Sequence, residues 1–372
     1  MMTTILIFIG VLALLIFVHE LGHYLTAIRN GVTAKEFGFG FPPRLIGVVK
    51  NDNGAWEFVG RKQKTAYRNT IFSLNWIPLG GFVRIKGEDG EDTDPDSFSQ
   101  QSIWVRFKIL VAGVVMNVVA AFVLFVVALS LGMPESVPDG TPGSVIHVLS
   151  VAEDSPAQHA GISIGDMMVS ICDDTECTDV KTTEDIIRFT REHAGQEVAV
   201  TVRRGAKERT VHATLRAADH EGGALGVGIG ATRTAELSFL EVIGGAAQQT
   251  VSLLWMIIQG FGTLVSGALF GGAGAADIAG PVGIAQITGQ KAAQGLAQLA
   301  HFAGVLSLNL AFINILPIPA LDGGRIIFVM MEALRGRPIK KQTEAAIHGI
   351  SFLALIALMI AVTVNDVLRI IN

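Results

Sequence analysis

The H-E-L-G-H motif at residues 19–23 combines residue types and a spacing that could bind a catalytic metal ion. Residues four apart on a helix share one face, so the imidazoles of His19 and His23 could bind one Zn²⁺ while Glu20 acts as a general base. The motif ends an apolar stretch of bilayer length, where an ionisable side chain costs about 2.5–3.5 kcal/mol. The alternative is that the helix ends at Val18 and the three side chains are interfacial anchors.

A catalytic zinc site usually has three protein ligands and one position open for water, so the two histidines need a partner. The best candidate is Asp322, in the segment N-I-L-P-I-P-A-L-D-G-G at residues 314–324, where two prolines break an apolar stretch. Taken alone, Asp322 could equally be the N-cap of a helix that begins near Gly323, because aspartate is a favoured capping residue. A histidine pair expected at the same membrane depth favours metal ligation.

The composition predicts a multi-pass α-helical membrane protein. Hydrophobic residues make up 50% of the 372-residue chain and charged residues only 16%, whereas soluble domains carry roughly 25% charged residues. Several stretches of about 20 residues almost lack charge and are long enough to span a bilayer. The net charge of −5 excludes a broad basic face for nucleic acid, and the two cysteines exclude a disulfide scaffold.

We expect about four transmembrane helices, at residues 4–28, 109–131, 296–316 and 345–364. The predicted organisation is transmembrane helix 1 with the histidine motif (1–28), a cytoplasmic-side, membrane-associated β-hairpin region (29–108), transmembrane helix 2 (109–132), a linker and one soluble α+β domain (133–235), interfacial amphipathic helices with a Gly-rich loop (236–295), transmembrane helix 3 with the Asp322 segment (296–334), and a basic loop with transmembrane helix 4 (335–372).

Basic residues set the expected orientation, because short loops rich in Lys and Arg stay on the cytoplasmic side. The loop at residues 335–341 is short and basic, so it should lie there together with the region 29–108. Both termini and the soluble domain then lie on the outer side. The stretch 237–270 is apolar but interrupted by glycine and glutamine. Because a crossing there would move the basic loop outside, we expect it in the outer interface rather than across the bilayer.

These motifs resemble the site-2 protease family of intramembrane zinc metalloproteases, most closely its bacterial RseP type. The resemblance rests on residues 19–23, 38–40, 76–81, 280–284 and 314–323, which follow the family's order along most of the chain.

The resemblance implies one Zn²⁺ held by His19, His23 and Asp322, with Glu20 as the general base and Asn314 near the substrate. It also implies an enzyme of the bacterial inner membrane that cuts the transmembrane segments of single-pass regulators, such as anti-sigma factors. An upstream protease would trim these substrates outside first, and signal-peptide remnants are a further substrate class.

A substrate helix must unwind before its peptide bonds can be cut, and backbone groups freed in lipid need partners. We expect the segment 76–85, predicted as β-structure that turns about Gly80 and Gly81, to pair with the unwound segment as an extra strand. Pro317 is a further candidate for contacting the substrate.

The segment 155–166 of the soluble domain resembles a PDZ domain of the bacterial protease type, which predicts a short helix, a turn at Gly165 and Asp166, and then a strand. PDZ domains bind peptide C-termini by strand addition. Residues 223–228 are either the loop that faces a peptide carboxylate or a Gly-rich exit from the domain. Cys172 and Cys177 either form a disulfide that closes a hairpin or are two free thiols.

Two other functions stay open at this stage. A membrane receptor or scaffold would use the PDZ domain to capture exposed C-termini and would bind no metal. A zinc-dependent membrane enzyme could instead act on soluble or lipid substrates, and its cut site would then lie outside the membrane.

Overall fold

The chain folds as two compact units. The computed structural model describes residues 2–51, 53–60, 67–88, 92–205, 207–217, 223–233, 237–270, 280–337, 339 and 341–371. The helical unit comprises Met1–Val126, Ile243–Gly289 and Ala300–Asn372, and the β-rich unit comprises Val127–Val242 and Gln290–Leu299. The soluble domain predicted at residues 133–235 falls within the β-rich unit.

Long apolar helices dominate the helical unit. They are α1 (Met2–Arg29), α2 (Ile103–Ser130), α5 (Phe239–Phe270), α7 (Leu296–Ile315) and α9 (Lys341–Ile371). Among the described residues, five helices are long and apolar enough to cross a membrane, which is one candidate more than the four predicted. None of the most apolar window of α9 is buried inside the molecule, which is typical of a helix that contacts lipid rather than protein.

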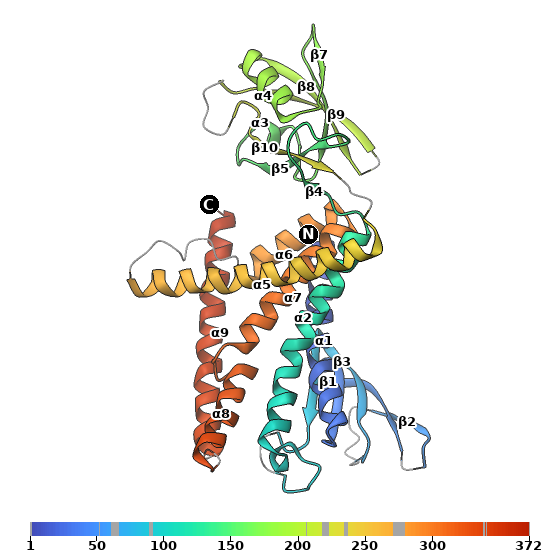
Figure 1. Cartoon of the computed structure of the whole chain (residues 1–372), viewed down its shortest axis with the longest axis vertical. Helices are drawn as coiled ribbons and strands as arrows, with labels where there is room; N and C mark the ends of the chain where they lie inside the picture. The colour runs from blue at the N-terminus through green and yellow to red at the C-terminus, as the bar shows by residue number, and fades with distance from the viewer. Residues whose placement is uncertain are drawn as a thin grey trace. The chain divides into compact units, whose positions relative to one another are not determined.

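The additional candidate span is α5, the stretch expected in the outer interface. Residues 243–270 of α5 run across α1, α2, α7 and α9, whereas those four helices run roughly along one another (Figure 1). Only 6% of its most apolar window is buried. Its crossing direction supports an interfacial position, which stays a prediction.

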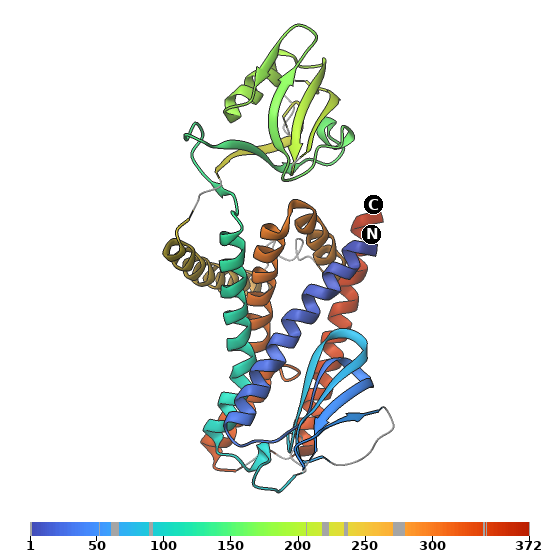
Figure 2. The same ribbon diagram turned by 90° about the vertical axis from the view of Figure 1, so that its right-hand side faces the viewer.

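The two ends of the helical unit carry different elements. Both termini lie at one end, and the end of α8 (Asp322–Arg335) and the start of α9 lie at the other, beside a small sheet (Figures 1 and 2). The helix α6 (Pro281–Gln294) begins in the family-like segment 280–284, where the Asp366 carboxylate accepts hydrogen bonds from the N–H groups of Gly280 and Gly283 at 3.0 and 2.9 Å. The Gly-rich loop at residues 271–279 lies outside the described residues.

The small sheet has the strand order β2-β1-β3, with β1 at Ala34–Lys50, β2 at Trp56–Val59 and β3 at Ile71–Ile85. Residues 36–39 of β1 pair with both 71–74 and 81–84 of β3, so β3 folds around this part of β1. The turn expected at residues 80 and 81 is therefore a bend inside one continuous strand. Gly80 has a φ of +76°, and a Cβ there would lie 2.6 Å from the Ile16 side chain, so glycine lets β3 pack onto α1.

The β-rich unit is built on a seven-stranded sheet with the path β4-β10-β5-β6-β8-β9, and β7 pairs with β6. Its strands are β4 (Glu135–Ser136), β5 (Val145–Val151), β6 (Met167–Cys172), β7 (Cys177–Asp179), β8 (Glu197–Arg204), β9 (Lys207–Thr214) and β10 (Val227–Arg233), with the short helices α3 (Pro156–His159) and α4 (Thr183–Glu192). Alternate residues of β8 (Val198, Val200 and Val202) are buried in the core, as its period-two pattern predicts. The helix and strand expected within residues 155–172 are α3 and β6.

Cys172 and Cys177 form a disulfide between the paired ends of β6 and β7. Of the two alternatives for these cysteines, the free thiols are therefore wrong. The two residues are cross-strand partners, which is the placement that a hairpin-closing disulfide needs.

Candidate metal centre

The α1 helix continues through the whole H-E-L-G-H motif and ends at Arg29. The alternative that α1 ends at Val18 is therefore wrong. His19 and His23 are each only 6% exposed, so the two imidazoles lie on the protein-facing side of α1. Their Nε2 atoms are 3.1 Å apart.

Asp322 is the first residue of α8, and the N-cap position belongs to Leu321, which makes no side-chain capping bond. The interpretation of Asp322 as an N-cap is therefore wrong, and its carboxylate points elsewhere. The local fold depends on the glycines that follow. A Cβ at Gly323 would lie 2.1 Å from the Leu316 carbonyl oxygen, and a Cβ at Gly324 would lie 2.3 Å from Pro319 Cα. These glycines let the proline-containing turn fold back tightly against the start of α8.

The structure brings His19, His23 and Asp322 together across more than 300 residues of sequence. Asp322 Oδ2 lies 2.9 Å from His19 Nε2 and 3.3 Å from His23 Nε2. One ligand atom from each of the three side chains lies within 4.8 Å of the others. Within the described ranges, no second group of three such side chains meets this criterion.

The α2 helix forms the floor of this cluster, which sequence analysis missed. A Cβ at Gly113 would lie 2.4 Å from His23 Nε2 and 2.7 Å from His19 Nε2. Four residues later, Asn117 is completely buried and its amide lies 3.2 Å from His19 Nδ1. The carbonyl oxygen of Ile109 lies 2.7 Å from His23 Nδ1. An asparagine within an otherwise apolar span is the sequence signal that could have pointed to this face, because intramembrane polar residues usually have a function.

Glu20 lies beside the cluster and faces the sheet. Its Oε2 accepts a hydrogen bond from the backbone N–H of Val83 in β3, at 3.1 Å. A hollow of about 230 Å³ lies at this site, and its lining residues include Glu20, His23, Val83 and Asp322. Another hollow, of about 360 Å³, lies in the β-rich unit. The space beside the general-base candidate is therefore lined by residues of α1, α2, α8 and β3.

The residues predicted to bind substrate are less closely grouped. Gly81 lines the hollow, whereas Gly80, Asn314 and Pro317 are not among its lining residues. Asn314 is half-buried in the last turn of α7, and Pro317 is exposed. The arrangement brings one of these four residues to the hollow, and the roles of the other three remain predictions.

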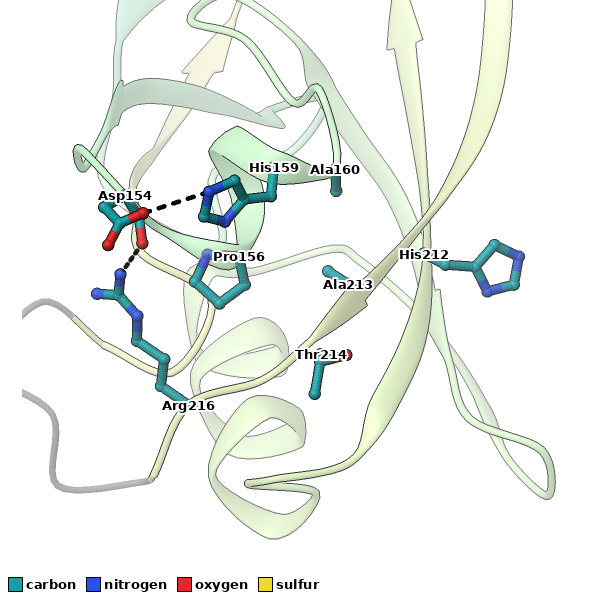
Figure 3. A pocket seen from close by; sticks show the side chains of 8 residues that line it. All are labelled: Asp154, Pro156, His159, Ala160, His212, Ala213, Thr214 and Arg216. Carbon is teal, nitrogen blue, oxygen red and sulfur yellow. Dashed lines mark hydrogen bonds and ion pairs between the residues drawn. The ribbon is translucent and has the colours of Figure 1, made fainter.

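The hollow of about 360 Å³ in the β-rich unit is also lined by histidine and aspartate. Figure 3 shows His159 directed at Asp154, with Nε2 and Oδ1 3.3 Å apart, while His212 points away from both. The Arg216 guanidinium donates to the Asp154 carbonyl oxygen. The side chains of His159 and Asp154 are 70% and 91% exposed, so this hollow holds solvated surface groups that do not converge on one point.

The comparisons with known proteins address the whole chain. The model of peptidase family M50 matches residues 7–358. The chain belongs to peptidase family M50. It is 28% identical to the zinc metalloprotease RasP of Bacillus licheniformis over 99% of both chains, and 28% identical to the regulator of sigma-W protease RasP of Bacillus subtilis over 98% of both. A putative zinc metalloprotease of Agrobacterium fabrum is 31% identical over 97% of this chain and 94% of its own.

This M50 peptidase is an intramembrane zinc metalloprotease located in a membrane, as the sequence predicted. The receptor or scaffold alternative is therefore wrong.

Proposed function

We propose that His19, His23 and Asp322 hold the catalytic Zn²⁺, that Glu20 is the general base, and that the enzyme cuts peptide bonds within transmembrane segments of single-pass proteins. The observation that carries the proposal is the convergence of two buried imidazoles and the partly buried Asp322 carboxylate beside Glu20 and a hollow. Each residue stands at a motif position of the family resemblance.

The three side chains fit a zinc ion by two criteria. Their closest ligand atoms are 2.9–3.3 Å apart, near the edge of about 3.3 Å of a tetrahedron whose metal–ligand distance is about 2.0 Å. The absence of a side chain at Gly113 leaves a space next to both Nε2 atoms that even a methyl group would fill. Two imidazoles and one carboxylate are also a common ligand set of catalytic zinc.

The chain's own groups account for the proton transfers. Zinc, when bound, supplies a Lewis acid that polarises the scissile carbonyl and acidifies water. Glu20 takes a proton from the attacking water and delivers it to the leaving amine. The Val83 N–H holds the Glu20 carboxylate at the edge of the hollow. Asn314 is proposed to contact the substrate near the scissile bond and to help stabilise the developing negative charge.

The free edge of β3 is proposed to receive the unwound substrate. The Val83 N–H is directed at Glu20 on α1 rather than at β1, so the outer edge of this part of β3 faces the general base. In an extended strand, alternate residues present their backbone groups to the same edge, and Gly81 is two residues before Val83. A substrate strand paired along this edge would satisfy its freed backbone groups beside the catalytic residues. Gly80 and Pro317 are proposed to shape the approach to it.

The proposed substrates are membrane-anchored regulators of the anti-sigma type, already trimmed outside by another protease, with signal-peptide remnants as a second class. One relative is named for regulation of sigma-W. The cytoplasmic side would hold the sheet and the basic residues between α8 and α9, which share one end of the helical unit (Figure 2). Both termini and the β-rich unit would be periplasmic, and the disulfide supports an oxidising compartment for that unit.

The β-rich unit is proposed to be a PDZ domain that binds extended peptides along β10, with the loop at 223–226 facing a peptide carboxylate. Part of this edge is already covered, because β4 pairs with the end of β10 and the Val137 N–H donates to the Ala231 carbonyl at 3.0 Å. A peptide longer than a few residues would therefore have to displace residues 135–137. This feature favours short, exposed C-termini as ligands.

The test compares wild type, Glu20→Gln and Glu184→Gln, an exposed glutamate of α4 that serves as the matched control. Each protein is purified in detergent, its zinc content is measured, and it is incubated with a single-pass membrane substrate truncated on its outer side. We expect about one zinc in all three and a roughly 10²–10⁴-fold loss of cleavage only in Glu20→Gln. Normal cleavage by Glu20→Gln would exclude Glu20 as the base, and a cut site outside the transmembrane segment would favour soluble or lipid-facing substrates.

A further inference from the structure

Gly113 and Asn117 lie one turn apart on the same face of α2, and both meet the histidine pair. Gly113 leaves space beside the two Nε2 atoms, as described above. Asn117 instead brings an amide to the opposite nitrogen of one ring, His19 Nδ1, at 3.2 Å. The two residues thus lie beside the two nitrogens of the His19 ring, on a helix that supplies none of the proposed ligands.

A histidine that ligates a metal through Nε2 carries its proton on Nδ1, and that N–H needs an acceptor. His23 has one: its Nδ1 lies 2.7 Å from the Ile109 carbonyl oxygen, which can only accept. Among the hydrogen bonds of the described residues, none joins the His19 ring to a backbone carbonyl oxygen. The polar group recorded next to its Nδ1 is the Asn117 side chain.

Asn117 has the required acceptor, its side-chain oxygen Oδ1. Its Oδ1 is buried and has no hydrogen-bond partner among the described residues. The oxygen and nitrogen of an amide exchange places by a half-turn about the last side-chain torsion, and their assignment follows from the hydrogen-bond network. If His19 binds the metal through Nε2, its Nδ1 carries the proton. The amide orientation consistent with this proton places Asn117 Oδ1 toward His19 Nδ1–H.

The position of the amide is fixed from the other side of α2. The Ser307 hydroxyl of α7 donates to the Asn117 backbone carbonyl at 2.8 Å, and both residues are completely buried. A buried hydrogen bond of this kind holds the turn of α2 against α7. Asn117 therefore presents its amide to His19 from a backbone that is itself anchored.

We propose that Asn117 is a positioning residue, which accepts a hydrogen bond from His19 Nδ1–H through Oδ1 and so fixes the ring orientation and tautomer for zinc binding. The inference rests on the proposed role of His19 as a zinc ligand. Partners of this kind raise the basicity of a ligating imidazole, and their loss typically lowers metal affinity 10–100-fold.

The test measures the zinc dissociation constant of the full-length protein in detergent, by competition with a chelating dye. Asn117→Leu removes the acceptor at nearly constant volume, and we expect zinc binding about 10–100-fold weaker. Asn117→Asp keeps an acceptor in either orientation, and we expect binding as tight as wild type or tighter. Ser307→Ala loosens the anchor of α2 without touching the imidazole, and we expect a change below about threefold.

The outcomes separate this inference from the proposed function. Wild-type affinity in Asn117→Leu overturns it, as does equal weakening in Asn117→Asp and Asn117→Leu, or a loss in Ser307→Ala as large as that in Asn117→Leu. If Asn117→Leu does not fold, Asn117→Asp decides alone, because a tenfold weaker affinity contradicts an acceptor role. His19→Ala is measured in parallel: if its zinc affinity equals wild type, the proposed metal site itself is wrong.

Discussion

Each of the two hollows described above is lined by a histidine and an aspartate 3.3 Å apart, and the surroundings of these two pairs differ. The side chains of His23 and Asp322 are 8% and 18% exposed, whereas those of His159 and Asp154 are 70% and 91% exposed. The buried pair is joined by a second histidine and faces the empty side of a glycine, but His212 near the exposed pair points away (Figure 3).

The difference shows that separation and cavity size alone do not identify a site. The hollow in the β-rich unit is the larger one, about 360 against 230 Å³. An exposed ion pair contributes little, since water solvates both partners as well as they solvate each other. Buried polar side chains that converge need a cation or a proton to balance them, and this requirement supports the cluster on α1 and α8 as the proposed metal site.

The largest expected effect comes from changing the aspartate of each pair. Asp322→Asn removes an anionic ligand from a buried site, so we expect zinc affinity and cleavage to fall roughly a thousandfold. Asp154→Asn should leave both within twofold, since that carboxylate is solvated and asparagine tolerates the backbone φ of 53° at this position. Equal losses in the two variants, measured by zinc titration and substrate cleavage, would show that Asp322 has no greater role in zinc binding than Asp154.

A second variant probes the space rather than the ligands. Gly113→Ala places a methyl group 2.4 Å from His23 Nε2, so we expect at least a hundredfold weaker zinc binding, since the metal must approach this nitrogen to about 2.0–2.1 Å. Gly10→Ala on α1 is the matched control, because a Cβ at Gly10 meets nothing within 4 Å. Unchanged zinc affinity in Gly113→Ala would show that the metal lies elsewhere.

The β-rich unit also contains a buried carboxylate, that of Asp166, whose charge is balanced by an arginine of the chain. Asp166 is completely buried and accepts from Arg204 Nε and Nη2 at 2.6 and 2.7 Å. Arg204→Met strands this charge, and we expect the free energy of unfolding of the unit to fall by about 2–3 kcal/mol, below the value for a fully buried pair because Arg204 is half-exposed.

The matched control for this variant is Arg203→Met, whose guanidinium pairs with the exposed Glu208 at 3.0 Å and should cost under about 1 kcal/mol. Urea-dependent pulse proteolysis of the full chain measures both variants. Zinc content should stay at the wild-type level in each. A loss of zinc in Arg204→Met would contradict the view that Asp166 is purely structural.

The smallest expected effect concerns the N-terminus of α4. Burial raises the pKa of Asp185, but hydrogen bonds from the side chain and backbone of Thr182 and from the Lys181 N–H outweigh burial and hold that pKa below its ordinary value. The ionised carboxylate completes a capping box with Thr182. We expect Asp185→Ala to lower the free energy of unfolding by about 1 kcal/mol at neutral pH.

The pH dependence has a definite sign. Because the folded-state pKa is depressed, the stabilisation is present above the ordinary aspartate pKa of about 3.9 and is lost as the pH falls through the lower folded value. The wild type and Asp185→Ala should therefore converge in acid, with Glu184→Ala unchanged throughout. A difference that persists at low pH would show that Asp185 acts through packing.

The positions of the three proposed ligands could be predicted from the sequence for identifiable reasons. The spacing of His19 and His23 fixes their common face on any helix, and the proline break before Asp322 places a carboxylate at matching depth. Gly113 and Asn117 were not accessible, because they matter only once α2 is known to pack against the histidine pair, and that packing is set by contacts far apart in the chain.

Two further differences between the predicted and the observed structure also depend on contacts between distant parts of the chain. The bend in β3 depends on β1 pairing with both of its halves, which local patterns around Gly80 do not encode. The helix α5 has the length and hydropathy of a transmembrane helix. Only its direction relative to the other long helices distinguishes it from them. The glycines after Asp322 do have a local explanation, since the tight turn before α8 leaves no room for side chains.

X-ray absorption spectroscopy at the zinc edge tests directly whether His19, His23 and Asp322 bind the metal. The spectra of the purified wild type, His23→Ala and His159→Ala are compared. We expect two imidazole nitrogens at about 2.0–2.1 Å and one or more oxygens at about 2.0–2.2 Å from the zinc in wild type and in His159→Ala. His23→Ala should lose one nitrogen or all of the zinc. An unchanged first shell in His23→Ala, or a shell without imidazole in wild type, would contradict the assignment of the metal to His19, His23 and Asp322.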